Sequence, residues 1–315
     1  MTGPATDSVP PAVRGKLRLA ARGSALSLAQ VELMARALAP WTDTEIATYR
    51  TTGDRLSHLD AAITGKGVFT KEIDEALLDG RADVGVHSLK DLPAELPAGL
   101  VLAAVPARED ASDVLVSRPR RTFAELPQGA RIGTGSPRRR AQLLSARPDL
   151  AVSEARGNVD TRIRRLEEGR WDAIVLARAG LARLGRLSDI DDVFGPDVLL
   201  PAIGQGALAL VARAGDTEVL QALAAVDHAP SHAEVLAERG LLQRLHAGCR
   251  APLAGRAVIA GDRMRLSAAV YSLDGRVAMR EEAEGSAGAP DELSERVARQ
   301  LLARGAGSLL EEARE

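Results

Sequence analysis

Residues 86–93 read VHSLKDLP and mark the point where an apolar strand pattern gives way to ionisable side chains. Ala82 to Ser88 is typical of a buried strand because apolar residues alternate in it, and the closing proline ends regular structure soon afterwards. Lys90 and Asp91 are therefore expected just past the carboxyl end of a sheet strand, where open α/β sheets bind ligands. An ordinary surface Lys-Asp pair in a turn is the alternative, and these eight residues do not decide between the two.

The composition is typical of a soluble globular protein. Because 315 residues are too many for one typical core, about two or three domains are expected. A net charge of −2 gives no global reason to expect a nucleic-acid partner. No apolar run is long enough to span a membrane, and residues 1–15 lack the apolar core of a signal peptide. We therefore expect a cytoplasmic protein with no membrane partner.

Two sparse residue types are informative. Cys249 is the only cysteine, which excludes an internal disulfide and a multi-cysteine metal site, so we expect no metal. It either fills space or reacts. Lysine is rare beside arginine, and three of the few lysines fall between residues 66 and 90. Lys66 and Lys90 therefore indicate places that need a flexible ammonium rather than a planar guanidinium.

Strand and helix patterns alternate in the first part of the chain. Leu17 to Ala21 predicts a strand, and the turn Arg22-Gly23-Ser24 leads into a helix. Free backbone N–H groups, the helix dipole and Arg22 together favour an anion site there, although a plain capped helix is the alternative. The long polar passage Thr51 to Gly67 ends in Gly65-Lys66-Gly67. Long loops with glycine hinges inside compact domains are often lids.

The same pattern returns from about Asp113. Ser136 as N-cap and Pro137 at the first helical position predict a helix start, and three arginines follow it. Two such α/β units imply two lobes with a cleft between them. The last part differs: Ser231 and Glu234 are spaced as a capping box, and later strand patterns and a long helix predict a small α+β domain.

Six arginines lie at or near predicted strand ends or first helical turns, so many of them can converge on one cleft. Such a cluster needs several anions, either the phosphates of a nucleic acid or the carboxylates of a small molecule. Three Phe, two Trp and two Tyr are few for nucleic-acid stacking, and Arg binds carboxylates bidentately, so carboxylates are favoured. The arginines are Arg22, Arg138, Arg139, Arg156, Arg162 and Arg183.

Seven motifs follow one another between Arg22 and Pro252: RGSALSLAQ, GKGVFTKEI, VHSLKDLP, GTGSPRRRAQL, RGNVDTR, LPAIGQGAL and LHAGCRAP. In this order they closely resemble the porphobilinogen deaminase family, also called hydroxymethylbilane synthases. The resemblance implies a monomeric transferase of porphyrin and heme biosynthesis. Its members join four porphobilinogen molecules head to tail, releasing ammonia each time, into the linear tetrapyrrole hydroxymethylbilane.

The resemblance also implies a fold. It predicts two lobes with mixed sheets, like those of periplasmic binding proteins, and a small C-terminal α+β domain. The expected domains are residues 15–110 with 205–226, carrying the catalytic Asp and the lid; residues 111–204, carrying the arginine-rich anion sites; and residues 227–315, carrying the cysteine.

Site residues follow from the same resemblance. Cys249 matches the cysteine that holds a dipyrromethane cofactor by a thioether bond, Asp91 matches the catalytic carboxylate, and Lys90 matches the lysine beside it. Besides Cys249 and Lys90, the expected cofactor-binding residues are Ser88, Thr134, Ser136, Arg138, Arg139 and Arg156. The expected substrate-binding residues are Arg22, Ser24, Gln30, Lys66, Phe69, Arg156, Arg162 and Arg183.

Two other functions compete with this one. A non-catalytic two-lobed solute-binding protein for a polycarboxylate would share the architecture, but it would not need Asp91 or a reactive Cys249 and would normally carry an export signal. A Schiff-base enzyme using Lys90 would require a lowered lysine pKa in a pocket.

Overall fold

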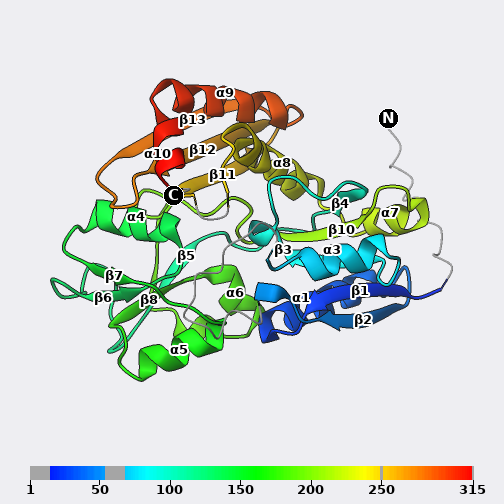
Figure 1. Cartoon of the computed structure of the whole chain (residues 1–315), viewed down its shortest axis with the longest axis horizontal. Coiled ribbons are helices and arrows are strands. Elements are labelled where there is room, and N and C mark those ends of the chain that lie inside the picture. The colour runs from blue at the N-terminus through cyan, green and yellow to red at the C-terminus, as the bar shows by residue number, and fades with distance from the viewer. Residues whose placement is uncertain (1–14, 54–67, 249–250, 314–315) are drawn as a thin grey trace, which may run out of the picture.

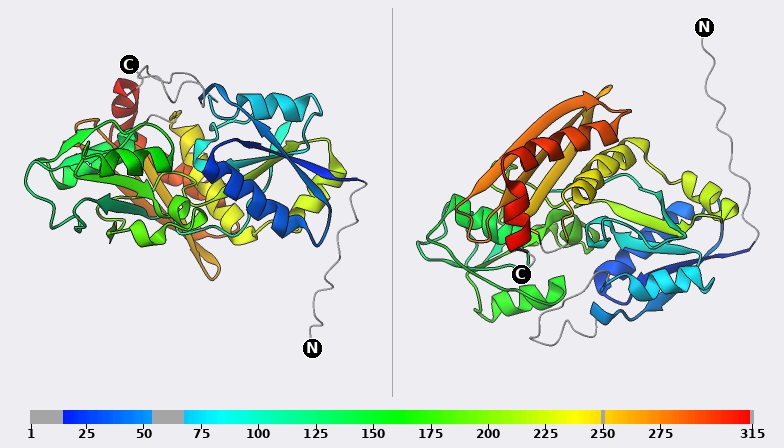
Figure 2. Two further views of the ribbon diagram at one scale, coloured as in Figure 1. Left: turned by 90° about the horizontal axis from the view of Figure 1, so that it is seen from below. Right: turned by 45° about the horizontal axis from the view of Figure 1, so that its top comes forward.

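The computed structural model describes residues 15–53, 68–248 and 251–313, which are built around three β-sheets (Figure 1). Two of the sheets have five strands each and form two lobes, and the third has three strands. The two views in Figure 2 show the C-terminal sheet and its helices packed across both lobes.

The first lobe is a mixed sheet in the order β2-β1-β3-β10-β4. β1 runs parallel to β2 and β3, whereas β10 is antiparallel to β3 and β4. Side chains alternate across β1: Leu19 packs against α1, and Ala20 packs on the opposite face with α3. The elements are β1 (Leu17–Arg22), α1 (Ala25–Leu38), β2 (Thr44–Tyr49), α3 (Lys71–Leu78), β3 (Val84–Ser88), β4 (Leu100–Ala104), β10 (Leu208–Arg213) and α7 (Thr217–Ala224).

The second lobe repeats this plan in the order β7-β6-β8-β5-β9. β6 is parallel to β7 and β8, and β5 is antiparallel to β8 and β9. Leu143 of α4 packs on one face, and Ile163 of α5 packs on the other. The elements are β5 (Asp113–Ser117), β6 (Arg131–Gly133), α4 (Pro137–Ala146), β7 (Ala151–Ser153), α5 (Val159–Glu167), β8 (Ala173–Ala177), α6 (Arg178–Arg183), the 3₁₀ turn η2 (Leu187–Asp189) and β9 (Asp192–Val193).

Two connections join the lobes. The chain leaves the first sheet after β4 and enters the second lobe as the antiparallel strand β5, and it returns after residue 199 to become β10. Each lobe therefore contains one strand that follows a crossing from the other lobe. The sheets are mixed as expected, and the predicted strand over 82–88 begins at Val84.

The C-terminal part is an antiparallel sheet, β11-β12-β13, covered by helices. Leu241, Leu266 and Val297 are completely buried between them. The fold is thus two α/β lobes plus a small α+β domain. The elements are α8 (Ala229–Arg244), β11 (Leu253–Ala260), β12 (Arg263–Tyr271), β13 (Ala278–Ser286), α9 (Pro290–Ala303) and α10 (Ala306–Glu312).

The start of α8 differs from the sequence prediction. His228 is the N-cap residue, and its imidazole Nδ1 accepts a hydrogen bond from the Ser231 backbone N–H. The predicted capping box of Ser231 and Glu234 is therefore wrong, because both residues already lie inside the helix. The Glu234 carboxylate instead accepts from Ile259 N–H and pairs with Arg256, which ties α8 to β11.

The C-terminal sheet is attached to both lobes. Gly275 of the β12–β13 turn packs so tightly on α4 that a Cβ there would lie 2.3 Å from the Ala141 carbonyl oxygen. On the other side, the Arg239 guanidinium of α8 donates to the carbonyls of Pro93 and Ala94. That contact holds the chain directly after Asp91. Within the described ranges, no helix has the length and apolar character that a membrane crossing needs.

Candidate functional site

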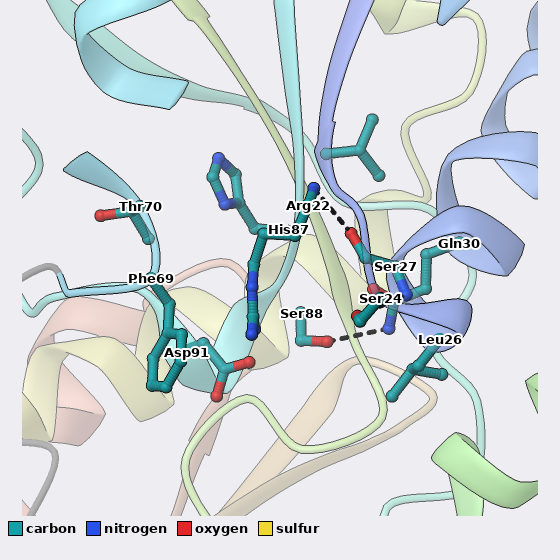
Figure 3. Close-up of a pocket in the computed structure, with 11 residues that line it drawn as sticks. Arg22, Ser24, Leu26, Ser27, Gln30, Phe69, Thr70, His87, Ser88 and Asp91 are labelled. Atoms are coloured by element: carbon teal, nitrogen blue, oxygen red, sulfur yellow. Dashed lines mark hydrogen bonds between the residues drawn. The ribbon is translucent and has the colours of Figure 1, made fainter. Parts of the chain in front are cut away.

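A pocket opens at the carboxyl ends of β1 and β3, between the start of α1 and the chain preceding α3 (Figure 3). It is lined by polar and charged groups from four separate segments. Six of the predicted site residues meet there: Arg22, Ser24, Gln30, Phe69, Ser88 and Asp91.

The start of α1 forms one wall of this pocket. Ser24 is the N-cap and accepts a hydrogen bond from Ser27 N–H. The Ser27 hydroxyl in turn accepts from the backbone N–H of Arg22, which fixes the end of β1. One turn further along, the Gln30 side chain donates to the Ser88 hydroxyl at 2.8 Å and so joins α1 to β3.

Phe69 forms the opposite wall. Its ring lies under the Arg22 guanidinium, with 4.3 Å from the guanidinium carbon to the ring centroid, a cation–π contact. Gly53 makes room for the ring, since a Cβ on that residue would lie 2.2 Å from a ring carbon. In Figure 3 the Arg22 side chain runs between Phe69 and Ser88 toward Asp91.

Lys90 and Asp91 lie in a single 3₁₀ turn, η1 (Leu89–Asp91), directly after β3. The position past the strand end is the one predicted from the sequence. Asp91 lines the pocket, whereas the Lys90 ammonium donates to the Gln205 side-chain oxygen at 3.3 Å, toward the second lobe. Loss of hydration and the charge of Arg139 lower the pKa of Lys90 to about 8, although Asp91 and Asp113 oppose this change.

Arg162 and Arg183 bring the second lobe into the same region. Arg162 is close enough to feel the charges of Arg139 and Asp91, and burial lowers its pKa to about 10. Arg183 donates to the Gly206 carbonyl at 2.6 Å, and burial likewise lowers its pKa to about 10. The site therefore contains groups from both lobes.

Three of these cations have only neutral hydrogen-bond acceptors. Lys90 donates to an amide oxygen, Arg162 donates to the Gly157 carbonyl, and Arg183 donates to the Gly206 carbonyl. None of the three forms an ion pair with a carboxylate in the described part of the chain. Half-buried positive charge without a counter-ion favours an anionic ligand.

Arg138 and Arg139 have a different environment. Both are nearly inaccessible to solvent, and both pair with the carboxylate of Asp113, each with an N–O distance of 2.7 Å. The two guanidinium groups hold the pKa of that carboxyl well below its usual range even though burial opposes this. The predicted contact of these arginines with ligand carboxylates stays a prediction.

The remaining predicted residues of the second lobe lie around the start of α4 and the end of β7. Ser136 caps α4 by accepting from Arg139 N–H, and the buried Thr134 hydroxyl accepts from Ser136 N–H. Arg156 pairs with Glu154 at 2.8 Å. These contacts fix the start of α4 and the end of β7, and the cofactor contacts of Thr134, Ser136 and Arg156 stay predictions.

Sequence reasoning missed three residues of this region. Asp113 and Gln205 connect the cations described above, and His87 lines the pocket beside Arg22. Burial and the charge of Arg22 lower the pKa of His87 to about 4, so its imidazole is neutral at physiological pH. His87 lies inside the VHSLKDLP stretch, and this position could have marked it as a site residue. Asp113 stands at the start of an apolar strand, and its sequence neighbours do not mark it as part of a site.

Two predicted residues, Cys249 and Lys66, lie outside the described residues. The described chain reaches Gly248 after α8 and resumes at Ala251, whose N–H donates to the Gly248 carbonyl. In the described ranges, no three His, Cys, Asp or Glu side chains are grouped so as to hold a metal ion.

Two family models match this chain. The model described as "Porphobilinogen deaminase, dipyromethane cofactor binding domain" matches residues 17–221. The model described as "Porphobilinogen deaminase, C-terminal domain" matches residues 232–303. The first match alone covers more than half of the chain.

Curated relatives agree with these matches along nearly the full length. The porphobilinogen deaminase of Rubrobacter xylanophilus is 48% identical over 302 residues, 94% of this chain and 97% of the relative. That of Nitratidesulfovibrio vulgaris is 46% identical over 307 residues, 94% of this chain and 96% of the relative. Among solved structures, an arginine-specific periplasmic binding protein of Salmonella typhimurium aligns with a TM-score of 0.39 and 16% identity, over 68% of this chain and 92% of that one.

Proposed function

This chain belongs to the porphobilinogen deaminase family, and from that premise we propose which of its residues carry out the family's reaction. The enzyme is a transferase of porphyrin and heme biosynthesis. It condenses four porphobilinogen molecules, with release of ammonia at each step, into the linear tetrapyrrole hydroxymethylbilane.

The observation that carries the proposal is the positive charge around Asp91 that forms no ion pair with a carboxylate among residues 15–53, 68–248 and 251–313. Lys90, Arg162 and Arg183 bond only neutral oxygens, and burial lowers the pKa of each. An acetate or propionate group brought among them restores a counter-charge, which is worth more in such a site than in water. The pyrrole substrates and products carry such groups.

Lys90, one of these three cations, is also among the residues proposed for the family's dipyrromethane cofactor. When bound, the cofactor supplies the free α-carbon onto which the product chain grows. We propose that Cys249 attaches it and that Lys90, Ser88, Thr134, Ser136, Arg138, Arg139 and Arg156 hold its carboxylates. Arg22, Ser24, Gln30, Lys66, Phe69, Arg162 and Arg183, together with Arg156, are proposed to hold the substrate. In support, the Arg22 guanidinium, fixed by Phe69, lines the same pocket as Asp91.

Asp91 is the proposed catalytic residue. Departure of ammonia leaves a cationic methylene-pyrrole, which the α-carbon of the bound chain attacks before a proton is lost. A carboxylate held in a rigid 3₁₀ turn can accept the pyrrole N–H hydrogen bonds and stabilise that cation. Lys90 lies next to Asp91 in the same turn. We propose that its ammonium binds carboxylates of the ligand and that, with a pKa of about 8, it also donates or accepts a proton.

The three sheets support a division into three domains. We propose that residues 15–110 with 205–226 form the catalytic lobe, residues 111–204 the second lobe, and residues 227–315 the cysteine-bearing domain. We further propose that the enzyme works as a cytoplasmic monomer whose only partners are its pyrrole substrate and cofactor, without nucleic acid or membrane.

One observation bears on a Schiff-base enzyme. The pKa of Lys90, about 8, meets the requirement that such an enzyme would place on its lysine. Borohydride added with porphobilinogen distinguishes the two mechanisms, because an alkylated Lys90 would identify a Schiff base and an unmodified Lys90 is expected for the deaminase. The solute-binding protein is the weaker alternative, since the family matches include the cofactor-binding domain.

The proposal is tested by purifying the protein and measuring its intact mass, its colour with an acid aldehyde reagent and its turnover of porphobilinogen. We expect the mass of two covalently attached pyrrole units, a red colour and formation of the linear tetrapyrrole. A protein of unmodified mass that binds porphobilinogen without consuming it would instead be a solute-binding protein.

A further inference from the structure

Gln205 occupies an unusually constrained position on the second connection between the lobes. It lies between two glycines with positive φ, Gly204 at 70° and Gly206 at 89°. A Cβ on Gly204 would lie 2.1 Å from the Leu89 side chain, and one on Gly206 would lie 2.2 Å from the Glu109 carbonyl oxygen. The turn is therefore packed directly on η1 and on the first connection, and both positive φ angles favour glycine on either side of Gln205.

The side chain of Gln205 is buried and uses both ends of its amide. The nitrogen donates to the Ala111 carbonyl at 2.7 Å and to the Asp113 carboxylate at 2.8 Å. These bonds fix the orientation of the amide. Its oxygen then accepts from the Lys90 ammonium at 3.3 Å and from the Arg139 guanidinium at 3.4 Å.

Gln205 thus connects one cation from each lobe. Lys90 belongs to the first lobe, and Arg139 and Asp113 belong to the second. Two like charges held on one neutral oxygen repel each other, and the Asp113 carboxylate on the far side of the amide offsets that repulsion. Without the amide, Lys90 would keep Asp91 beside it in η1 but would lose its tie to the second lobe.

We propose that Gln205 is a positioning residue for the condensation reaction, holding the Lys90 ammonium against the Arg139–Asp113 pair so that it faces the ligand carboxylates from a fixed place. This inference rests on the proposed function, because it takes Lys90 as part of the working site. Gln205 itself touches no reacting atom in this role.

Among the described residues, the charged groups that act most strongly on Lys90 are Asp91 on its own turn, Asp113 at the start of β5, and Arg138 and Arg139 on α4. The backbone carbonyl of Gln205 is held separately, by Arg108 Nε at 2.9 Å. A neutral substitution such as Gln205→Met therefore leaves these charges in place and removes only the amide that bridges them.

The test measures Lys90 directly rather than through activity. Purified holoenzyme is labelled with fluorodinitrobenzene across about pH 6 to 10, and peptide mass spectrometry follows each lysine separately. Lys16 and Lys71 are internal references. Gln205→Met removes the acceptor, so the Lys90 midpoint should fall. Gln205→Glu keeps an oxygen there and adds a negative charge, so the midpoint should rise, by about one pH unit in each case.

Gln142 supplies a matched control. It is as buried as Gln205 and also forms two amide hydrogen bonds, both with the backbone of Leu200 on the same connection. Gln142→Met should lower the melting temperature while leaving the Lys90 labelling midpoint unchanged. In parallel, Gln205→Met should reduce kcat about tenfold, the scale of a misplaced working group.

Opposite shifts of the Lys90 midpoint in the two Gln205 variants support the proposal. A wild-type midpoint in Gln205→Glu overturns it, and that variant alone decides if Gln205→Met does not fold. The proposed function fails separately, if the wild-type protein does not consume porphobilinogen. In that case shifted midpoints would still show that Gln205 sets the environment of Lys90, but the reaction served would not be this one.

Discussion

Arg108 and Glu238 form a buried ion pair where the two lobes meet the C-terminal domain. Their side chains are 3% and 0% exposed, and the two guanidinium–carboxylate bonds are 2.6 and 3.1 Å long. The same carboxylate accepts from Gly204 N–H on the second connection and from Ala257 N–H on β11. One side chain of α8 therefore fastens both connections between the lobes to the third domain.

We predict that Glu238→Gln lowers the melting temperature by about 5–15 °C, because removing one partner of a buried pair costs about 3–5 kcal/mol. Thermal unfolding followed by circular dichroism measures this. Glu168→Gln breaks the exposed pair of Arg164 and Glu168 on α5 and serves as control, with an expected change of about 2 °C or less. Equal shifts in the two variants would contradict the role of Glu238.

Asp91→Asn should lose at least about 10² in turnover, because neutral Asn cannot stabilise the cation left by departing ammonia. Asp91→Glu moves the charge by about 1.5 Å and should keep a measurable remainder. Mass spectrometry must first confirm that each variant carries the cofactor, since assembly of the cofactor uses similar chemistry. Turnover of loaded Asp91→Asn within about threefold of wild type would exclude Asp91 as the catalytic group.

Cys249→Ala should fold but lack both the covalent adduct and turnover, since no other cysteine can replace the thiolate. Intact mass and an activity assay check this. The variant should also melt at a lower temperature than the loaded wild type, because a ligand bound to the native state stabilises it. An active Cys249→Ala protein carrying the adduct would refute the proposed attachment site.

Asp74 should make stability depend on pH. It is buried on α3, its Oδ1 has no hydrogen-bond partner in the part of the chain that the structure describes, and burial raises its pKa to about 6 from 3.8. The fold therefore prefers the neutral acid, so the stability that Asp74 allows is complete below about pH 4 and is lost as the pH rises through 6. Asp74→Asn, neutral throughout, should be stabilised by about 1–2 kcal/mol at pH 8.

Urea unfolding at pH 8 and near pH 4 measures this difference, and the gain from Asp74→Asn should disappear at the lower pH. Asp79→Asn, at the exposed C-terminal end of the same helix, is the control and should show no such dependence. A gain of the same size at both pH values would mean that folding does not raise the pKa of Asp74, and it would contradict the prediction.

The sequence located Lys90 and Asp91 because a strand pattern ends there, and alternation and helix-start signals are local. The same kind of signal placed the N-cap of α4 at Ser136. At α8 the local signal gave the wrong helix start. His228 can also act as an N-cap, and it precedes Ser231 in the chain. The two-lobe plan and the positions of Arg22 and Asp91 were therefore predictable from local patterns, whereas Gln30, Phe69 and Ser88 were expected only from the resemblance to the family.

The network behind the site was not predictable from local patterns. Gln205 and Lys90 are 115 residues apart in the chain, and Asp113 meets Arg138 and Arg139 only when β5 lies beside β8. Arginines at the start of a helix predict an anion, but the pattern does not say whether the anion comes from a ligand or from the protein itself. Here the protein supplies one, Asp113.

The course of the chain also sets an order in which the molecule can be completed during synthesis. β10 fills the space between β3 and β4, yet it is made only after the whole second lobe. Until then the first lobe emerges from the ribosome with two strand edges lacking their partner, which are sites for aggregation. The turn η1, whose Leu89 N–H donates to the Ala207 carbonyl, can therefore gain this hydrogen bond only after residue 207 has been made.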